Sequence, residues 1–127
     1  MGMKSDTFRQ PPSLVEAVRQ FLEELKELLG GVLVEVSVFG STAKGAAHPD
    51  SDIDVLVIVE GDRKEALRTI NEIHSSRLGD RWLQLAADGY VIELTVMGID
   101  EWRMMLEKGF SFPLEVERDK LVVFRRG

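Results

Sequence analysis

The hydrophobic and polar positions of the chain repeat with helical and strand-like periods, which predicts a domain built from both element types. After Pro12, apolar residues recur every three or four positions, so they line one face of a helix. Ser13 followed by Glu16 is typical of a helix start, and the pair Gly30–Gly31 of a helix end. The apolar residues of this helix are Leu14, Val15, Val18, Phe21, Leu22, Leu25, Leu28 and Leu29.

Two valine-rich segments then predict neighbouring strands. Residues 32–39 form the first strand, which runs directly into Gly40. Residues 51–59 form the second, which is apolar after an acidic start and is therefore expected to be central and covered on both faces. We expect a short helix over residues 42–46 and a loop over residues 47–50 between them.

The remaining pattern predicts a helix, one or two strands, a helix and a final strand. Asp62 with Glu65 repeats the capping pattern and starts a helix that ends near Arg77. Residues 82–86 and 90–97 are expected to be strands, and residues 121–124 a last strand. Between them, Asp100 is expected to cap a helix that ends at Gly109 and buries Trp102, Met105 and Leu106.

This element order predicts an α/β (α+β) fold with one small mixed sheet flanked by helices. Residues 1–12 are expected to be a flexible lead-in, and residues 13–127 a single domain, which is the size that 127 residues allow. No apolar run approaches the roughly 20 residues of a membrane helix, and the first residues lack the apolar core of a signal peptide. We therefore expect a cytoplasmic protein that does not contact a membrane.

Composition narrows the chemistry that the chain can perform. The absence of cysteine excludes disulfides, thiolate catalysis and cysteine zinc sites, and only two histidines are present. Any metal would then be a hard cation held by carboxylate oxygens. The formal net charge of −6 argues against bulk binding of nucleic acid, although a single nucleotide needs only a local positive site.

The first candidate element for chemistry is Gly40–Ser41 at a strand-to-helix junction. The unpaired N–H groups of a helix start stabilise a phosphate, and glycine lets the phosphate approach the backbone. Lys44 would add a positive charge one turn later, and Ser51 a hydroxyl from the far side of the loop. The alternative interpretation is a tight turn with a serine helix cap.

The second candidate element is Asp52–Ile53–Asp54 at the start of the next strand. Residues two apart on a strand project from one face, so the two carboxylates point the same way. Their mutual repulsion is relieved when a divalent cation lies between them, and Mg²⁺ is commonly held by such carboxylates together with substrate phosphates. The alternative interpretation is a solvated pair that helps solubility.

The two elements together are more specific than either one. Gly40-Ser41-Thr42-Ala43-Lys44-Gly45, followed by a short loop and Ser51-Asp52-Ile53-Asp54-Val55-Leu56-Val57, resembles the DNA polymerase β-type nucleotidyltransferase superfamily. The resemblance is strongest to its minimal members, which include antitoxins paired with HEPN toxins. The element order is similar to that of the family over residues 14–124.

This resemblance implies a third carboxylate on a later strand, and Glu93 is the acidic residue within the apolar strand expected at residues 90–97. An edge-strand glutamate facing water is the alternative. The chain departs from the family pattern in having Glu93 where aspartate is usual and Lys44 where arginine is frequent. Asp52, Asp54 and Glu93 are thereby implied to hold two Mg²⁺ ions, or Mn²⁺, while Gly40, Ser41, Lys44 and Ser51 bind phosphate.

The activity implied by the resemblance is transfer of a nucleoside monophosphate, AMP from ATP or another NTP, to an acceptor hydroxyl with release of pyrophosphate. An alternative from a different class is a binding module that neutralises a partner protein by contact. The expected partner is a helical HEPN-type protein, or a second copy of the chain in a homodimer. An aminoglycoside-type transferase is disfavoured because the extra helical domain of such enzymes has no counterpart.

Overall fold

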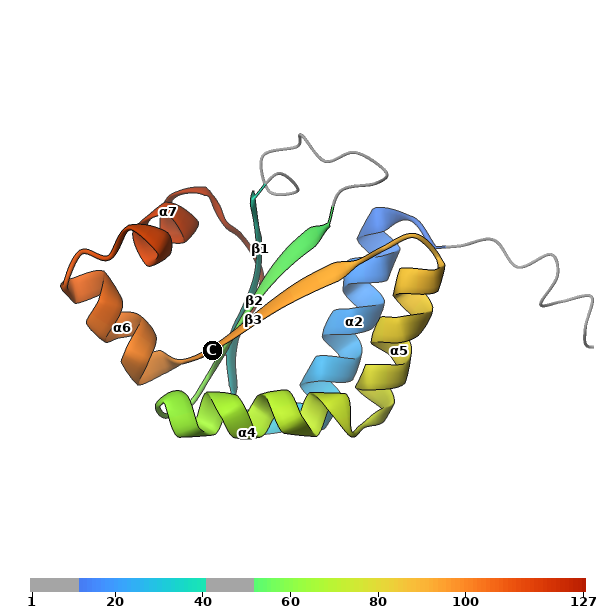
Figure 1. Ribbon diagram of the computed structural model, residues 1–127, viewed down its shortest axis with the longest axis horizontal. Helices are drawn as coiled ribbons and strands as arrows, with labels where there is room; N and C mark the ends of the chain where they lie inside the picture. The colour runs from blue at the N-terminus through green and yellow to red at the C-terminus, as the bar shows by residue number, and fades with distance from the viewer. Residues whose placement is uncertain (1–11, 41–51) are drawn as a thin grey trace, which may run out of the picture.

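The computed structural model describes residues 12–40 and 52–127, and the arrangement of their helices and strands is shown in Figure 1. The expected helix at residues 42–46, the loop at residues 47–50 and most of the N-terminal lead-in lie outside the described residues. In chain order, the elements are α2 (Leu14–Leu29), a 3₁₀ turn (Gly30–Val32), β1 (Leu33–Phe39), β2 (Ile53–Val59), α4 (Arg63–His74), α5 (Arg77–Ala87), β3 (Ile92–Gly98), α6 (Ile99–Glu107), α7 (Ser111–Asp119) and β4 (Leu121–Arg125).

The four strands form one mixed sheet in the order β3-β2-β1-β4. Strand β1 pairs antiparallel with β2 and with β4, whereas β2 and β3 run parallel. The predicted small mixed sheet is therefore confirmed, and the two strands that carry the central motif are direct neighbours.

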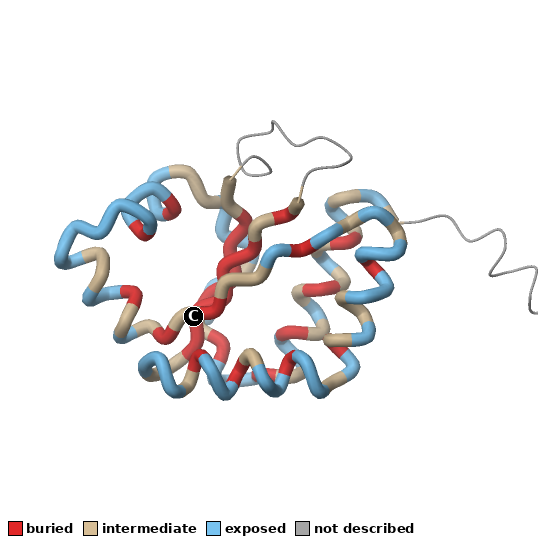
Figure 2. The backbone as a smooth tube through the Cα atoms, viewed as in Figure 1, coloured by how far each residue is buried: buried red, intermediate tan, exposed pale blue. Residues whose placement is uncertain are grey.

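Helices cover both faces of the sheet. Helices α2, α4 and α5 pack on one face, and α6 and α7 lie on the other (Figure 1). Because side chains alternate along β2, Val55 and Val57 enter the larger core beneath α2, whereas Leu56 and Ile58 meet Trp102 on the second face. The tube in Figure 2 is accordingly red along most of β2, as predicted for a strand covered on both sides.

The predicted helix starts are confirmed by their capping contacts. The Ser13 hydroxyl accepts a hydrogen bond from the Glu16 backbone N–H at 3.2 Å, and the Glu16 carboxylate pairs with Arg19. At the start of α4, the Asp62 carboxylate accepts from the Lys64 N–H at 2.9 Å. Each contact satisfies a backbone donor that the first helical turn leaves unpaired.

The strand predicted at residues 82–86 is wrong, because this segment belongs to α5. Helix α4 ends at His74, and Ser76 caps a new helix by accepting from the Leu78 N–H. Leu78 and Leu85 lie seven residues apart and are both buried, which is a helical spacing that the short apolar run concealed. Trp82 lies between them and donates from its indole N–H to the Ile92 carbonyl at 2.9 Å.

The C-terminal part contains a helix that the sequence did not predict. Helix α7 begins directly after Phe110 and has Pro113 in its first turn, where a missing N–H costs nothing. Helix α6 begins at Ile99, so Asp100 lies in its first turn rather than capping it. Trp102 is buried as predicted, whereas Met105 and Leu106 are half-buried.

Candidate active site

Four of the seven predicted site residues lie in the described part of the chain. Gly40 follows the last residue of β1, Asp52 and Asp54 flank the start of β2, and Glu93 is the second residue of β3. Ser41, Lys44 and Ser51 lie outside the described residues, so their predicted phosphate contacts stay predictions.

The parallel pairing of β2 and β3 brings the three carboxylates together. Asp54 is the direct register partner of Glu93, and the Ile53 N–H donates to the Val91 carbonyl at 2.8 Å, which fixes this register. Ile53 points into the larger core, so Asp54 points to the opposite face, towards α6 and α7. Segments almost 40 residues apart in sequence therefore contribute to one acidic cluster.

The electrostatics of Glu93 reflect this proximity. Hydrogen bonds with Asp52 and Asp54, followed by the repulsion of their charges, raise the pKa of Glu93 from 4.5 to about 7. Burial contributes least to the shift in pKa, and Glu93 is exposed. Near neutral pH, ionisation of all three groups is therefore opposed by their mutual repulsion, which an added positive charge would relieve.

The carboxylate cluster fits a divalent cation. Acidic oxygens from two strands converge, and their repulsion is what such an ion would relieve. Within residues 12–40 and 52–127, no group of three acidic or histidine side chains already surrounds an ion-sized space.

Gly40 lies against the carboxylate cluster. Its φ is +70°, a left-handed conformation that glycine adopts without strain. A Cβ atom at this position would lie 2.3 Å from Oδ2 of Asp54, so a side chain there would displace the Asp54 carboxylate. A half-buried glycine with no side chain beside the acidic cluster leaves its backbone open to a phosphate.

A pocket that the sequence did not reveal adjoins Gly40. Its volume is about 150 Å³, and it lies between the end of β1 and α7. It is lined by Phe39, Gly40, Phe112, Glu115, Val116, Arg118 and Asp119. Neither Phe112 nor Glu115 stood out in the sequence, because α7 was not predicted. The one pocket residue that the sequence placed beside the central motif is Phe39, which directly precedes Gly40.

A buried ion-pair network supports α7 and β4 from the same face of the sheet. Glu35 on β1 accepts from Lys120 Nζ at 2.6 Å and from the Ser37 hydroxyl at 2.7 Å, and it also pairs with Arg125 at 3.1 Å. Lys120 additionally contacts Glu117 at 2.7 Å. Burial acts to raise the pKa of Glu35, but the hydrogen bonds from Lys120 and Ser37 outweigh it and hold that pKa below its usual value.

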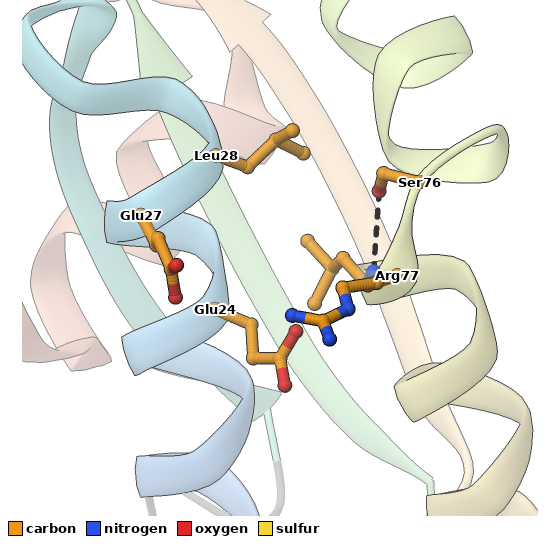
Figure 3. A pocket seen from close by; sticks show the side chains of 6 residues that line it. Glu24, Glu27, Leu28, Ser76 and Arg77 are labelled. Atoms are coloured by element: carbon orange, nitrogen blue, oxygen red, sulfur yellow. Dashed lines mark hydrogen bonds between the residues drawn. The ribbon is translucent and has the colours of Figure 1, made fainter.

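Another pocket lies away from the carboxylates, between α2 and the start of α5 (Figure 3). Its volume is about 310 Å³, and Glu24, Leu28 and Arg77 are among its walls. Glu24 pairs with Arg81 at 3.2 Å, and the Ser76 hydroxyl serves the α5 cap. Because α2 and α5 pack on the other face of the sheet, this pocket is separate from the carboxylate cluster.

The mixed four-stranded sheet with helices on both faces is the fold of nucleotidyltransferases of known structure. The family model for the nucleotidyltransferase domain matches residues 18–118, and the chain belongs to this family. The spectinomycin adenyltransferase AAD(9) from Enterococcus faecialis, solved with ATP and spectinomycin, superposes with a TM-score of 0.65 at 17% identity, over 91% of this chain and 57% of that enzyme.

Two further similarities are more limited. A protein of Methanocaldococcus jannaschii with the provisional name protein adenylyltransferase is 39% identical over an alignment of 57 residues that covers 40% of this chain and 39% of the relative. The chain thus matches well under half of the length of this relative. A toxin–antitoxin structure with AMP-PNP has a TM-score of 0.47 at 17% identity, over 84% of this chain and 73% of that one.

No helix in the described residues is both long enough and apolar enough to span a membrane.

Proposed function

We propose that the chain transfers a nucleoside monophosphate, AMP from ATP, to an acceptor hydroxyl. The observation that carries the proposal is the convergence of Asp52, Asp54 and Glu93 beside the side-chain-free backbone of Gly40. The provisional name of the archaeal relative, of which 39% is matched, supports AMP as the transferred group.

In this reaction, the acceptor oxygen bonds to the α-phosphorus while the bond from that phosphorus to the bridging oxygen breaks. Pyrophosphate leaves with the electron pair of that bond. Glu93, which faces the same site as the two aspartates, would accept the proton of the acceptor hydroxyl. Gly40, with Ser41 and Lys44, holds the leaving phosphates.

Asp52, Asp54 and Glu93 would hold two Mg²⁺ ions, with Mn²⁺ as a substitute. Such ions supply neutralisation of the triphosphate charge and a lowered pKa for the attacking hydroxyl. The contribution of the chain is to hold the two strands that carry the carboxylates side by side through the β2–β3 register.

The test is transfer of label from ATP to proteins of a host-cell extract in the presence of Mg²⁺. Label at the α-phosphate should be transferred and label at the γ-phosphate should not, which separates nucleotidyl from phosphoryl transfer. The double variant Asp52→Asn/Asp54→Asn should lose at least about 100-fold of the transfer, the scale of losing a major electrostatic contact. Glu72→Gln, an exposed carboxylate on α4, is the matched control and should retain it.

Transfer that survives the double aspartate change would refute the assignment of the site. Transfer of the γ-label would refute the reaction class, even if the aspartates were essential.

A second candidate function, neutralisation of a partner protein by contact, is favoured by an apolar groove of about 400 Å³ between α2 and β4. Val15 and Leu121 on its walls are 78% and 54% exposed. Exposed apolar patches of this kind commonly mark protein interfaces. The family resemblance points to a helical HEPN-type toxin as the partner, with a homodimer as the other outcome.

The two functions can be separated with one co-expression experiment. A partner toxin should still be neutralised by Asp52→Asn/Asp54→Asn if contact is sufficient, and by Val15→Glu/Leu121→Lys if transfer is sufficient. Loss of neutralisation in the groove variant alone would support the contact function, and loss in the aspartate variant alone would exclude it.

A further inference from the structure

Three residues that are paired across neighbouring strands of the sheet place two carboxylates beside an aromatic ring. Glu93 on β3, Asp54 on β2 and Phe39 on β1 are consecutive register partners across three neighbouring strands. Paired residues of neighbouring strands lie about 5 Å apart and share a face. The Phe39 ring therefore lies one strand away from the carboxylate expected to hold the metal, on the same side of the sheet.

We propose that the pocket between β1 and α7 binds the base of the nucleoside triphosphate and prefers a base with an exocyclic amino group. This inference rests on the proposed nucleotidyl transfer. Gly40 belongs both to the pocket wall and to the surroundings of Asp54, so a ligand that follows the Gly40 backbone passes from the carboxylates into the pocket.

The aromatic rings supply an apolar wall for a planar base. Phe112 meets Phe39 edge-to-face, with ring centroids 5.9 Å apart, and meets Trp102 in the same way at 6.2 Å. These two contacts fix the Phe112 ring, yet Phe112 remains 44% exposed at the pocket. A fixed and partly exposed ring is a stacking surface for any nucleobase, because every base has a π-face.

The charged groups of the pocket provide selectivity among bases. Arg118 is neutralised by Asp119 through two hydrogen bonds of 3.3 and 3.1 Å. Glu115 lies one helical turn after Phe112 and is exposed. Its charge also acts on Arg118, but within the described part of the chain Arg118 donates its hydrogen bonds to Asp119 and not to Glu115. An ionised carboxylate only accepts hydrogen bonds, so it favours the amino groups of adenine, cytosine and guanine over uracil, whose N3–H donor lies between two carbonyl oxygens that repel the carboxylate.

The test measures equilibrium binding of ATP, UTP and inorganic tripolyphosphate, each with Mg²⁺, by calorimetry. Wild-type protein should bind ATP at least about tenfold more tightly than tripolyphosphate and more tightly than UTP. Phe112→Ala should weaken ATP binding about 5- to 100-fold, the range expected for loss of base stacking, and leave tripolyphosphate binding unchanged. Glu115→Gln should abolish the preference for ATP over UTP.

Phe110→Ala is the matched control, since this ring is 48% exposed and lies outside the pocket lining. Phe112→Leu keeps apolar volume against Trp102, so it should fold even if Phe112→Ala does not. Because leucine has no ring, this variant should bind ATP no more tightly than tripolyphosphate. The inference is overturned if both Phe112 variants that fold weaken ATP and tripolyphosphate equally, or change neither. If the wild type transfers the α-phosphate but Phe112→Leu still binds ATP more tightly than tripolyphosphate to the same degree, the base pocket is refuted and the activity is not. If the tighter binding of ATP depends on Phe112 but the wild type transfers nothing, the proposed activity is refuted and the base pocket is not.

Discussion

Gly40 and Asp54 are in such close contact that a Cβ atom on Gly40 would lie 2.3 Å from Oδ2 of Asp54. The antiparallel pairing of Phe39 with Asp54 creates this contact, because it places the residue after β1 beside the start of β2. The glycine thus serves two purposes at once: it adopts a φ of +70° and it leaves room for a functional carboxylate.

Gly40→Ala should therefore displace the Asp54 carboxylate. We expect nucleotidyl transfer to fall at least about tenfold, because a small misplacement of a catalytic group has large kinetic effects. Alanine at a positive φ also costs about 1–2 kcal/mol of folding stability. Gly109→Ala is the control: Gly109 has a φ of +76° but nothing within 4 Å of its Cβ position, so it carries the backbone strain without the clash. Equal activity losses in the two variants would contradict the steric explanation.

Protons should compete with metal ions at Glu93. Its pKa of about 7 lies above the ordinary 4.5, so the group is largely protonated at pH 6 and largely ionised at pH 8. Mg²⁺ affinity should consequently rise between pH 6 and pH 8, by up to about tenfold per pH unit below the pKa. Calorimetric titration in buffers of different ionisation enthalpy would detect the released proton. Glu93→Gln should bind Mg²⁺ more weakly and lose this pH dependence, and equal wild-type affinities at pH 6 and pH 8 would contradict the assignment.

The same shift in pKa sets the sign of the stability change without metal. A carboxyl group with a raised pKa in the folded state favours folding below pH 4.5, and this contribution is lost as the pH rises through about 7. The melting temperature of the metal-free wild type should thus fall more between pH 5 and pH 8 than that of Glu93→Gln. Thermal unfolding in the presence of a chelator would measure the difference.

Local patterns were sufficient to predict the described part of the central motif, which is β2 with its acidic start. The period-2 alternation of Asp52, Ile53 and Asp54 fixes the face of both carboxylates, and the apolar run after them requires a strand covered on both sides. Glu93 was identified because the family resemblance implies a third carboxylate on a later strand and Glu93 is the acidic residue between Ile92 and Leu94, although only the β2–β3 register shows that it lies beside Asp54.

The errors arose where the deciding contact is distant in sequence. Residues 82–86 have a short apolar pattern compatible with either period, and packing of Trp82 against Phe21 and Ile92 selects the helix. Glu35 is buried because Lys120 and Arg125, 85 and 90 residues later, compensate its charge. No window around Glu35 contains that information, so neither the network nor α7 could be predicted.

Gly98 ends β3 at a point of close packing against the start of α4. A Cβ atom there would lie 2.4 Å from the carbonyl oxygens of both Gly61 and Asp62. Gly98→Ala should therefore lower the free energy of unfolding by about 1–3 kcal/mol, the usual cost of overpacking, as measured by urea denaturation. Gly31→Ala is the control, because nothing lies within 4 Å of its Cβ position. A change of less than 0.5 kcal/mol, about the effect of an ordinary surface substitution, would show that the two segments can move apart.

Lys120→Met tests whether the buried network holds α7 and β4 on the sheet. The Lys120 and Glu35 side chains are only 6% and 9% exposed, so removing the ammonium leaves Glu35 buried with Arg125 and Ser37 as its remaining partners. We expect a loss of about 3 kcal/mol, the lower end for a broken buried pair, because those partners remain. Arg68→Met removes an exposed pair with Glu65 and should cost no more than about 1 kcal/mol.

Because Glu35 has a lowered pKa when folded, its stabilisation is present above pH 4.5 and disappears as the pH falls through that lowered value. The difference in stability between wild type and Lys120→Met should therefore shrink in acid. Urea denaturation of both variants at pH 7 and pH 3 would measure this, and a gap that does not narrow in acid would show that the Lys120–Glu35 charge pair is not its source.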